Sequence, residues 1–178
     1  QQNFNPGKAI QIRTAGKGGT SKQDDADIPN PSYLVEELNS TCDAASIGAT
    51  LQDAGATFLD DLAANKFAIG DTVYQTVTCQ HSRIVSVDSQ TQLTVFNSAF
   101  LPGALAVEYQ IYRKSPYGCL IYASFNKPNA QTIEVTDLNN NIHILNAFPT
   151  GDGIVPFQCR KLLETTTDTL NKIFALFQ

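Results

Sequence analysis

The sequence predicts an all-β protein of antiparallel β-sandwich, jelly-roll-like or small β-barrel units, preceded by a flexible N-terminal arm. Short runs of alternating or apolar residues recur at intervals of about ten residues, as in sandwiches and jelly rolls. Clusters of Gly, Asn and Asp separate these runs and mark turns. Only 16% of the 178 residues are charged. Thr, Ser, Asn and Gln take their place, which is typical of surfaces made from strands and turns.

Residues 1–40 are expected to form an extended arm that includes a short helix. The stretch 16–25 is rich in Gly and Lys and has no apolar periodicity, which indicates a linker. Further along, Ser32 stands where a helix N-cap is expected, ahead of the apolar residues Tyr33, Leu34 and Leu38. The arm is therefore predicted to close with one helical turn.

A short strand is predicted inside the arm, where residues 9–13 alternate between apolar and polar side chains. A strand on a flexible tether is suited to pairing with the sheet edge of another subunit. We expect Ile10, Ile12 and Arg13 to make this partner contact. Deletion of residues 1–25 should then abolish the contact and leave the fold intact.

Residues 41–114 are expected to form a module rich in β-hairpins. The runs 83–87 and 92–96 flank the polar turn Asp88–Thr91, which is a hairpin signal. Residues 72–78 alternate as a strand, and residues 105–112 supply another.

Residues 115–178 are expected to form a C-terminal β-sandwich module. The predicted strands cover residues 118–125, 131–136, 142–145, 154–162 and 172–177, with a break at the glycine-rich residues 151–153. His143 alternates with Ile142 and Ile144 and should point away from the core. The last run is strongly apolar through Ile173, Phe174, Leu176 and Phe177. It must dock in a sheet or against a partner, because an exposed apolar edge aggregates.

The charge and hydropathy of the chain weigh against two classes of partner. A net charge of -5 disfavours broad binding to nucleic acid, since that needs clustered Lys and Arg. The basic residues near the N-terminus are interpreted as a solvated arm. No apolar run is long enough to cross a bilayer, and no signal peptide is predicted. We therefore expect no direct nucleic-acid or membrane partner.

The four cysteines show no metal-binding or redox spacing. Cys42, Cys79, Cys119 and Cys159 form no CxxC pair, and we expect them to be free thiols, most of them buried in strands. His81 lies two residues after Cys79 on the same predicted strand, without a third partner nearby in the sequence.

The sequence contains no recognised catalytic motif, whether a nucleophile elbow, zincin motif, P-loop or dinucleotide fingerprint. We therefore expect no catalytic residues, no cofactor and no metal site, and the chain is predicted not to be an enzyme.

Two parts of the chain resemble proteins of tailed-phage particles. Residues 55–61 (GATFLDD), 69–74 (IGDTVY) and 84–95 (IVSVDSQTQLTV) resemble a module of tailed-phage virion proteins that reads GATF…D, (V/I)GDTVY and VxSVDSxTQLTL. Residues 118–122, 155–160 and 173–177 resemble the GxLYV, LPVQV and IxALW strands of spike-base and decoration proteins on phage heads. The resemblance covers roughly residues 50–178 and leaves the arm unexplained. The chain departs from the pattern by ending in Phe177-Gln178, where Trp is usual.

The resemblance implies a virion structural protein of the decoration, cement or spike-base kind, assembled in the host cytoplasm and located in the virion. Its expected partners are the major capsid protein or other virion proteins, with a homo-oligomer as the default. One alternative is a tail, neck or fibre-adaptor protein. Another is a β-sandwich that binds host glycans, for which Tyr109, Tyr112 and Tyr117 are the candidate aromatics. Tyr109 and Tyr112 fall on opposite faces of a strand, which favours packing roles for both.

Overall fold

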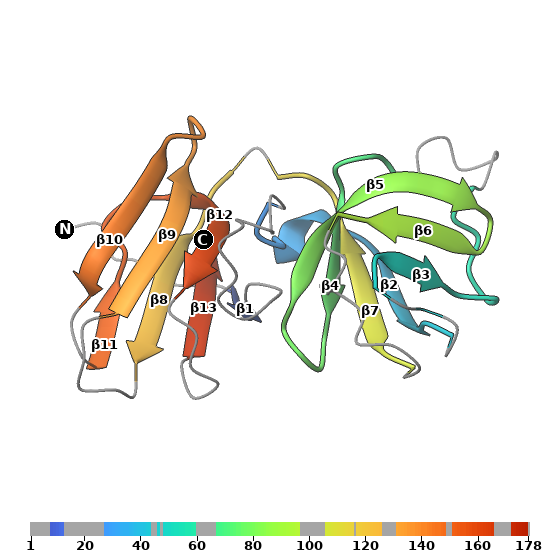
Figure 1. The fold of residues 1–178 in the computed structure, drawn as a ribbon, viewed down its shortest axis with the longest axis horizontal. Helices are drawn as coiled ribbons and strands as arrows, with labels where there is room; N and C mark the ends of the chain where they lie inside the picture. Colours follow the sequence, from blue (N-terminus) through green and yellow to red (C-terminus); the bar gives the residue numbers. More distant parts are fainter. Residues whose placement is uncertain are drawn as a thin grey trace.

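A computed structural model shows two β-rich lobes side by side, joined near the middle of the molecule (Figure 1). The structure describes residues 8–12, 27–43, 46, 48–59, 67–96, 106–115, 117–125, 131–148, 151–165 and 172–177. Across these residues the regular structure is almost entirely antiparallel β-sheet, with one short 3-10 turn. The predicted all-β fold class is confirmed.

The N-terminal lobe is one curled six-stranded sheet. Its strands, in sheet order, are β2 (Leu34–Thr41), β7 (Glu108–Tyr112), β4 (Thr72–Gln75), β5 (His81–Ser89), β6 (Gln92–Val95) and β3 (Thr50–Gln52). The predicted hairpin is formed by β5 and β6; β5 runs two residues further into the turn than expected, and β6 begins at the expected residue 92. Leu51, Val73, Ile84, Leu93 and Ile111 are fully buried and form the centre of this lobe's core.

The predicted helical turn at residues 32–38 is shorter than expected and is capped by a different residue. The 3-10 turn η1 covers only Pro31–Tyr33, and the Asn30 side chain, not that of Ser32, caps it by accepting from the Ser32 amide at 3.0 Å. The backbone is already extended at Leu34, which pairs with Tyr112 on β7. Pairing with the sheet therefore outweighs the helical pattern of the local sequence.

The C-terminal lobe is a sandwich of two sheets. One contains, in order, β1 (Lys8–Ile12), β13 (Lys172–Phe177), β8 (Leu120–Phe125) and β11 (Gly151–Ile154); the other contains β10 (Ile142–Phe148), β9 (Gln131–Asp137) and β12 (Cys159–Thr165). Ile121 and Ile173 from the first sheet meet Ile133, Val135 and Leu162 from the second in one buried core. The terminal run predicted to dock in a sheet lies between β1 and β8.

The glycine-rich residues 151–153 are not a break but part of an edge strand. β11 pairs antiparallel with β8, from Gly151 opposite Phe125 to Ile154 opposite Tyr122. A short strand at an edge tolerates glycine because only one of its sides must pair. The prediction that residues 151–153 interrupt the strands was therefore wrong.

The faces of β10 are the reverse of those predicted. The His143 ring lies 4.7 Å from the Phe157 ring, on the same face of the strand as Leu145, which packs against the core. Ile142 and Ile144 are instead 51% and 55% exposed. A shift of one residue in strand register exchanges the two faces of a strand, and alternation alone cannot say which face is buried.

The turn between β9 and β10 fixes this register through Asp137. Its carboxylate accepts from the amides of Asn139 at 2.8 Å and Asn141 at 2.9 Å. It also contacts the Asn141 side-chain amide at 2.9 Å and His143 Nε2 at 3.1 Å. These contacts hold the pKa of Asp137 below its ordinary value of 3.8. The hydrogen bond from the Asn141 side chain contributes most to this lowering of the pKa.

We expect Ile121→Ala to lower the free energy of unfolding by about 2–5 kcal/mol, because it empties a fully buried position in the sandwich core. The matched control is Ile154→Ala on β11, where the side chain is 52% exposed, and its effect should stay within about 0.5 kcal/mol. Chemical denaturation of both variants measures the difference. Equal losses in the two variants would contradict the assigned core.

Candidate functional site

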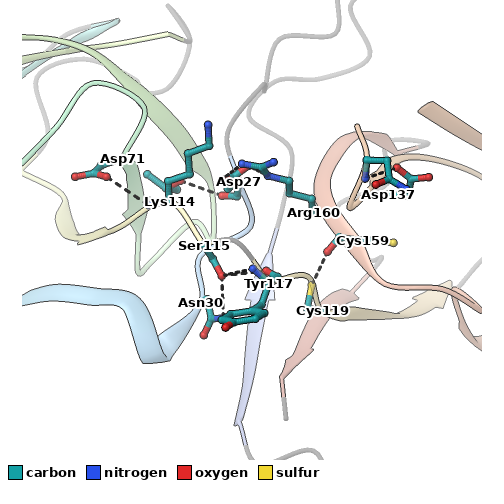
Figure 2. Close-up of polar contacts among 12 residues, drawn as sticks. Asp27, Asn30, Asp71, Lys114, Ser115, Tyr117, Cys119, Asp137, Cys159 and Arg160 are labelled. Atoms are coloured by element: carbon teal, nitrogen blue, oxygen red, sulfur yellow. Dashed lines mark hydrogen bonds and ion pairs between the residues drawn. The ribbon is translucent and has the colours of Figure 1, made fainter. Parts of the chain in front are cut away.

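The junction between the lobes is organised by a buried ion pair (Figure 2). Arg160 on β12 donates from Nε to Asp27 Oδ1 at 2.8 Å and from Nη2 to Asp27 Oδ2 at 3.2 Å. Asp27 is only 5% exposed. Its backbone carbonyl also accepts from the Thr72 hydroxyl on β4 at 3.0 Å, and the Ile28 amide donates to the Arg160 carbonyl at 2.9 Å. The extended segment 27–30 is therefore bonded to both lobes.

The connection from β7 to β8 crosses the same junction. The amide of Lys114 donates to Asp71 Oδ1 at 3.3 Å, on the N-terminal lobe. The Ser115 hydroxyl accepts from the Asn30 side-chain amide at 3.3 Å and exchanges bonds with the backbone of Tyr117 (Figure 2). These contacts fix the connection against the segment that precedes η1.

A groove of about 520 Å³ opens beside this connection. Tyr33 and Tyr117 stand together in its wall, with ring centroids 6.2 Å apart and planes at 46°. Asn30, Ser32 and Gln158 add neutral polar groups, and none of the described residues that line the groove is charged. Aromatic faces beside amide and hydroxyl groups suit a neutral ligand with both an apolar and a polar side.

Of the three tyrosines proposed for glycan binding, only Tyr117 lies at the surface, where it is 66% exposed. Tyr109 is buried and its hydroxyl lies 2.6 Å from Asp53 Oδ2, while Tyr112 is buried against Tyr74. Sequence reasoning missed Tyr33, the actual neighbour of Tyr117. No local pattern links the two residues, since the fold alone brings η1 to the β7–β8 connection.

The two sandwich sheets meet at one corner through Cys119 and Cys159. Each residue donates its amide to the other's carbonyl, at 2.9 and 2.8 Å. The neighbouring Gly118 is required here, because a Cβ would lie 2.7 Å from both the Cys159 carbonyl oxygen and Leu138 Cδ2. Burial raises the pKa of Cys159 to about 12 and raises that of Cys119 as well.

All four cysteines are free, as predicted, and Cys42, Cys119 and Cys159 are buried. Cys79 instead lies in the β4–β5 turn with a left-handed φ of 59°, whereas His81 is fully buried at the start of β5. The spacing of two residues on one predicted strand implied that Cys79 and His81 share a strand face, and the structure shows that they do not.

Within the described ranges, no group of three or more His, Cys, Asp or Glu side chains is placed to hold a metal ion. No helix in that part of the chain is long and apolar enough to span a membrane.

The strand predicted in the arm is present, and it pairs within its own chain. On β1, Ile10 lies opposite Ala175 and Ile12 opposite Ile173, both on β13. Ile12 is fully buried, whereas Arg13 lies outside the described residues. The Tyr74 hydroxyl on β4 donates to the Gln11 carbonyl at 2.8 Å, which ties β1 to the N-terminal lobe as well.

The residues named for the terminal docking strand divide between the two faces of β13. Ile173 and Phe177 are buried in the sandwich core, and Phe174 and Leu176 are half-buried on the other face.

Deletion of residues 1–25 removes Ile12 from the core of the C-terminal lobe and uncovers β13. We therefore expect that deletion to destabilise the C-terminal lobe rather than leave the fold intact.

Comparison with protein-family models finds no match to this chain, and comparisons with curated proteins and with solved structures find none either.

We expect Arg160→Gln to lower the free energy of unfolding by about 3–5 kcal/mol, because it leaves the Asp27 carboxylate buried without its counter-charge. The double variant Asp27→Asn/Arg160→Gln should recover part of this loss, since no lone charge then remains at the junction. Urea denaturation of both single variants and the double variant measures the coupling. Strictly additive losses would show that the pair does not act as a unit.

Proposed function

We propose that this chain is a structural subunit of a virus particle, of the capsid-associated decoration, cement or spike-base kind, with no catalytic role. The observation that carries the proposal is the tethered edge strand β1, which is joined to the rest of the fold through residues 13–26. The resemblance of residues 50–178 to phage virion modules supports it independently.

Exchange of β1 between copies of the chain offers a route to assembly that loses little binding free energy. β1 pairs with β13 over five residue positions and buries Ile12. The same contacts form if β1 from one copy pairs with β13 of a neighbour, so exchange loses little binding energy. Many copies joined in this way would stabilise a particle by avidity rather than through one tight site.

Within the described strands of the C-terminal lobe, two more end a sheet with an edge that pairs with no other described strand. β10 ends one sheet and β11 ends the other, and both lie at the side of the sandwich away from the N-terminal lobe (Figure 1). Each carries an exposed isoleucine, Ile144 at 55% and Ile154 at 52%. Strand edges with free backbone groups and exposed apolar side chains suit contacts with another copy or with the major capsid protein.

One observation favours a second function, the binding of a host glycan. The neutral groove combines the exposed ring of Tyr117 and the half-buried ring of Tyr33 with the amides of Asn30 and Gln158. Sugar rings present an apolar face and a rim of hydroxyl groups, which such a groove complements. This function is compatible with a location on a virus particle.

Quantitative peptide mass spectrometry of virus particles purified from the source of the sequence, scaled to the major capsid protein, tests the virion assignment. We expect on the order of hundreds of copies per particle for a cement or decoration protein, because such proteins follow the capsid symmetry. Copies on the order of tens would favour a spike base or a tail, neck or fibre-adaptor part. Absence from the particles would contradict the virion proposal, and a glycan array comparing the chain with its Tyr117→Ala variant would then test the groove.

Strand exchange predicts disulfide cross-links between chains in assembled particles. Gln11 on β1 lies opposite Phe174 on β13, so Gln11→Cys/Phe174→Cys places two thiols across the pair. A Cys79→Ser background leaves only the three buried native thiols. After oxidation we expect cross-links between chains in particles and within the chain in isolated monomers.

The matched control for this experiment is Ser86→Cys/Thr94→Cys, which spans the β5–β6 hairpin and must close within one chain. Cross-links confined to single chains in both variants, on particles as well as in monomers, would exclude strand exchange.

A further inference from the structure

A cavity of about 400 Å³ lies at the junction end of the C-terminal lobe, apart from the tyrosine groove, and basic side chains line it. Lys114, Arg160 and Lys161 converge on it from the β7–β8 connection and from β12. We propose that this cavity binds a phosphate or sulfate oxyanion, held by these three cations and by the hydroxyl of Thr136. The inference stands independently of the virion assignment.

An irregularity in β12 explains how adjacent basic residues reach one cavity. Consecutive side chains of a regular strand point to opposite faces. Cys159 pairs with Asp137 and Lys161 with the neighbouring Thr136, so Arg160 is an extra residue of β12 without an opposite residue on β9. Such a bulge re-aims a side chain, and here both Arg160 and Lys161 line the cavity.

Thr136 supplies the observation that points to a bound group. It lies in the central strand β9, between Ile142 on β10 and Lys161 on β12, and it is only 5% exposed. Its hydroxyl oxygen is buried and has no hydrogen-bond partner among the residues that the structure describes. A buried hydroxyl left without a partner costs about 1–3 kcal/mol. An oxyanion in the cavity would accept this hydrogen bond and remove that cost.

The charge of the lining selects an anion even though the whole chain has a net charge of -5. No acidic residue is among the described residues that line the cavity. Asp27 offsets part of the charge of Arg160, but the Lys114 ammonium makes no ion pair with the residues that the structure describes. Figure 2 shows the Lys114 side chain extending past the Asp27–Arg160 pair rather than toward Asp71.

Guanidinium, ammonium and hydroxyl donors together match the oxygens of a tetrahedral oxyanion. The neutral side chains of Asn140, Ile142 and Leu163 complete the described wall. The volume lies within the range of small-molecule pockets and exceeds what one phosphate group needs. The phosphoryl group can therefore be free phosphate or part of a phosphorylated saccharide.

Calorimetric titration with inorganic phosphate, at matched ionic strength in a phosphate-free buffer, tests the site. Thr136→Val keeps the shape of the side chain and removes only the partnerless hydroxyl, so stability should be unchanged or higher while the phosphate dissociation constant rises about tenfold. Lys114→Gln should weaken binding by at least about fivefold. The control Lys172→Gln removes the same charge from the exposed first residue of β13 and should leave the affinity unchanged.

Titration with glucose 6-phosphate separates the two sources of the phosphoryl group. Tighter binding than inorganic phosphate identifies a phosphorylated saccharide as the ligand class, and equal or weaker binding identifies free phosphate. No heat of binding for either ligand up to about 20 mM would overturn the proposal. Equal affinities for the chain and its Thr136→Val and Lys114→Gln variants would overturn it as well, because the anion would then bind elsewhere.

Discussion

The Asp27–Arg160 pair is the interaction on which the arrangement of the two lobes depends. It is bidentate, and its carboxylate is almost fully shielded from water. An uncompensated charge in that position would cost several kcal/mol, so any movement that separates the pair is strongly opposed. The adjacent bonds of segment 27–30 to Thr72 and to Ser115 hold the same segment against β4 and the β7–β8 connection. The tyrosine groove and the basic cavity both lie beside this junction.

Strand content followed from sequence wherever apolar alternation and turn residues agreed. The β5–β6 hairpin, the terminal strand β13 and the short strand β1 were all expected close to their observed positions. Local pattern failed where distant pairing or turn geometry decided the outcome. Leu34 pairs with Tyr112 in a sheet instead of continuing a helix. The local sequence could not predict this, because Tyr112 is remote in the chain. Asp137 set the register of β10 and so turned Ile142 and Ile144 outward.

The candidate sites were largely beyond sequence reasoning. Tyr117 was named, but Tyr33 reaches it only through the fold. Lys114 lies far from Arg160 in the chain, and the bulge that lets Arg160 and Lys161 share one cavity leaves no signature in the residue pattern. The sequence also could not predict which strand pairs with β1. Edge pairing is a matter of main-chain hydrogen bonds, which are nearly independent of side-chain identity.

The central position of β13 in its sheet constrains the order of events during synthesis. The strands of the N-terminal lobe lie between residues 34 and 112, so that lobe can fold while the ribosome is still translating the last strands of the C-terminal lobe. β1 emerges before the other strands described here, yet its strand partner appears only with residues 172–177. Throughout that interval β1 lacks its strand partner, and on a crowded polysome the first β13 available to it can belong to another chain. Translation itself would thereby favour intertwined products over isolated monomers.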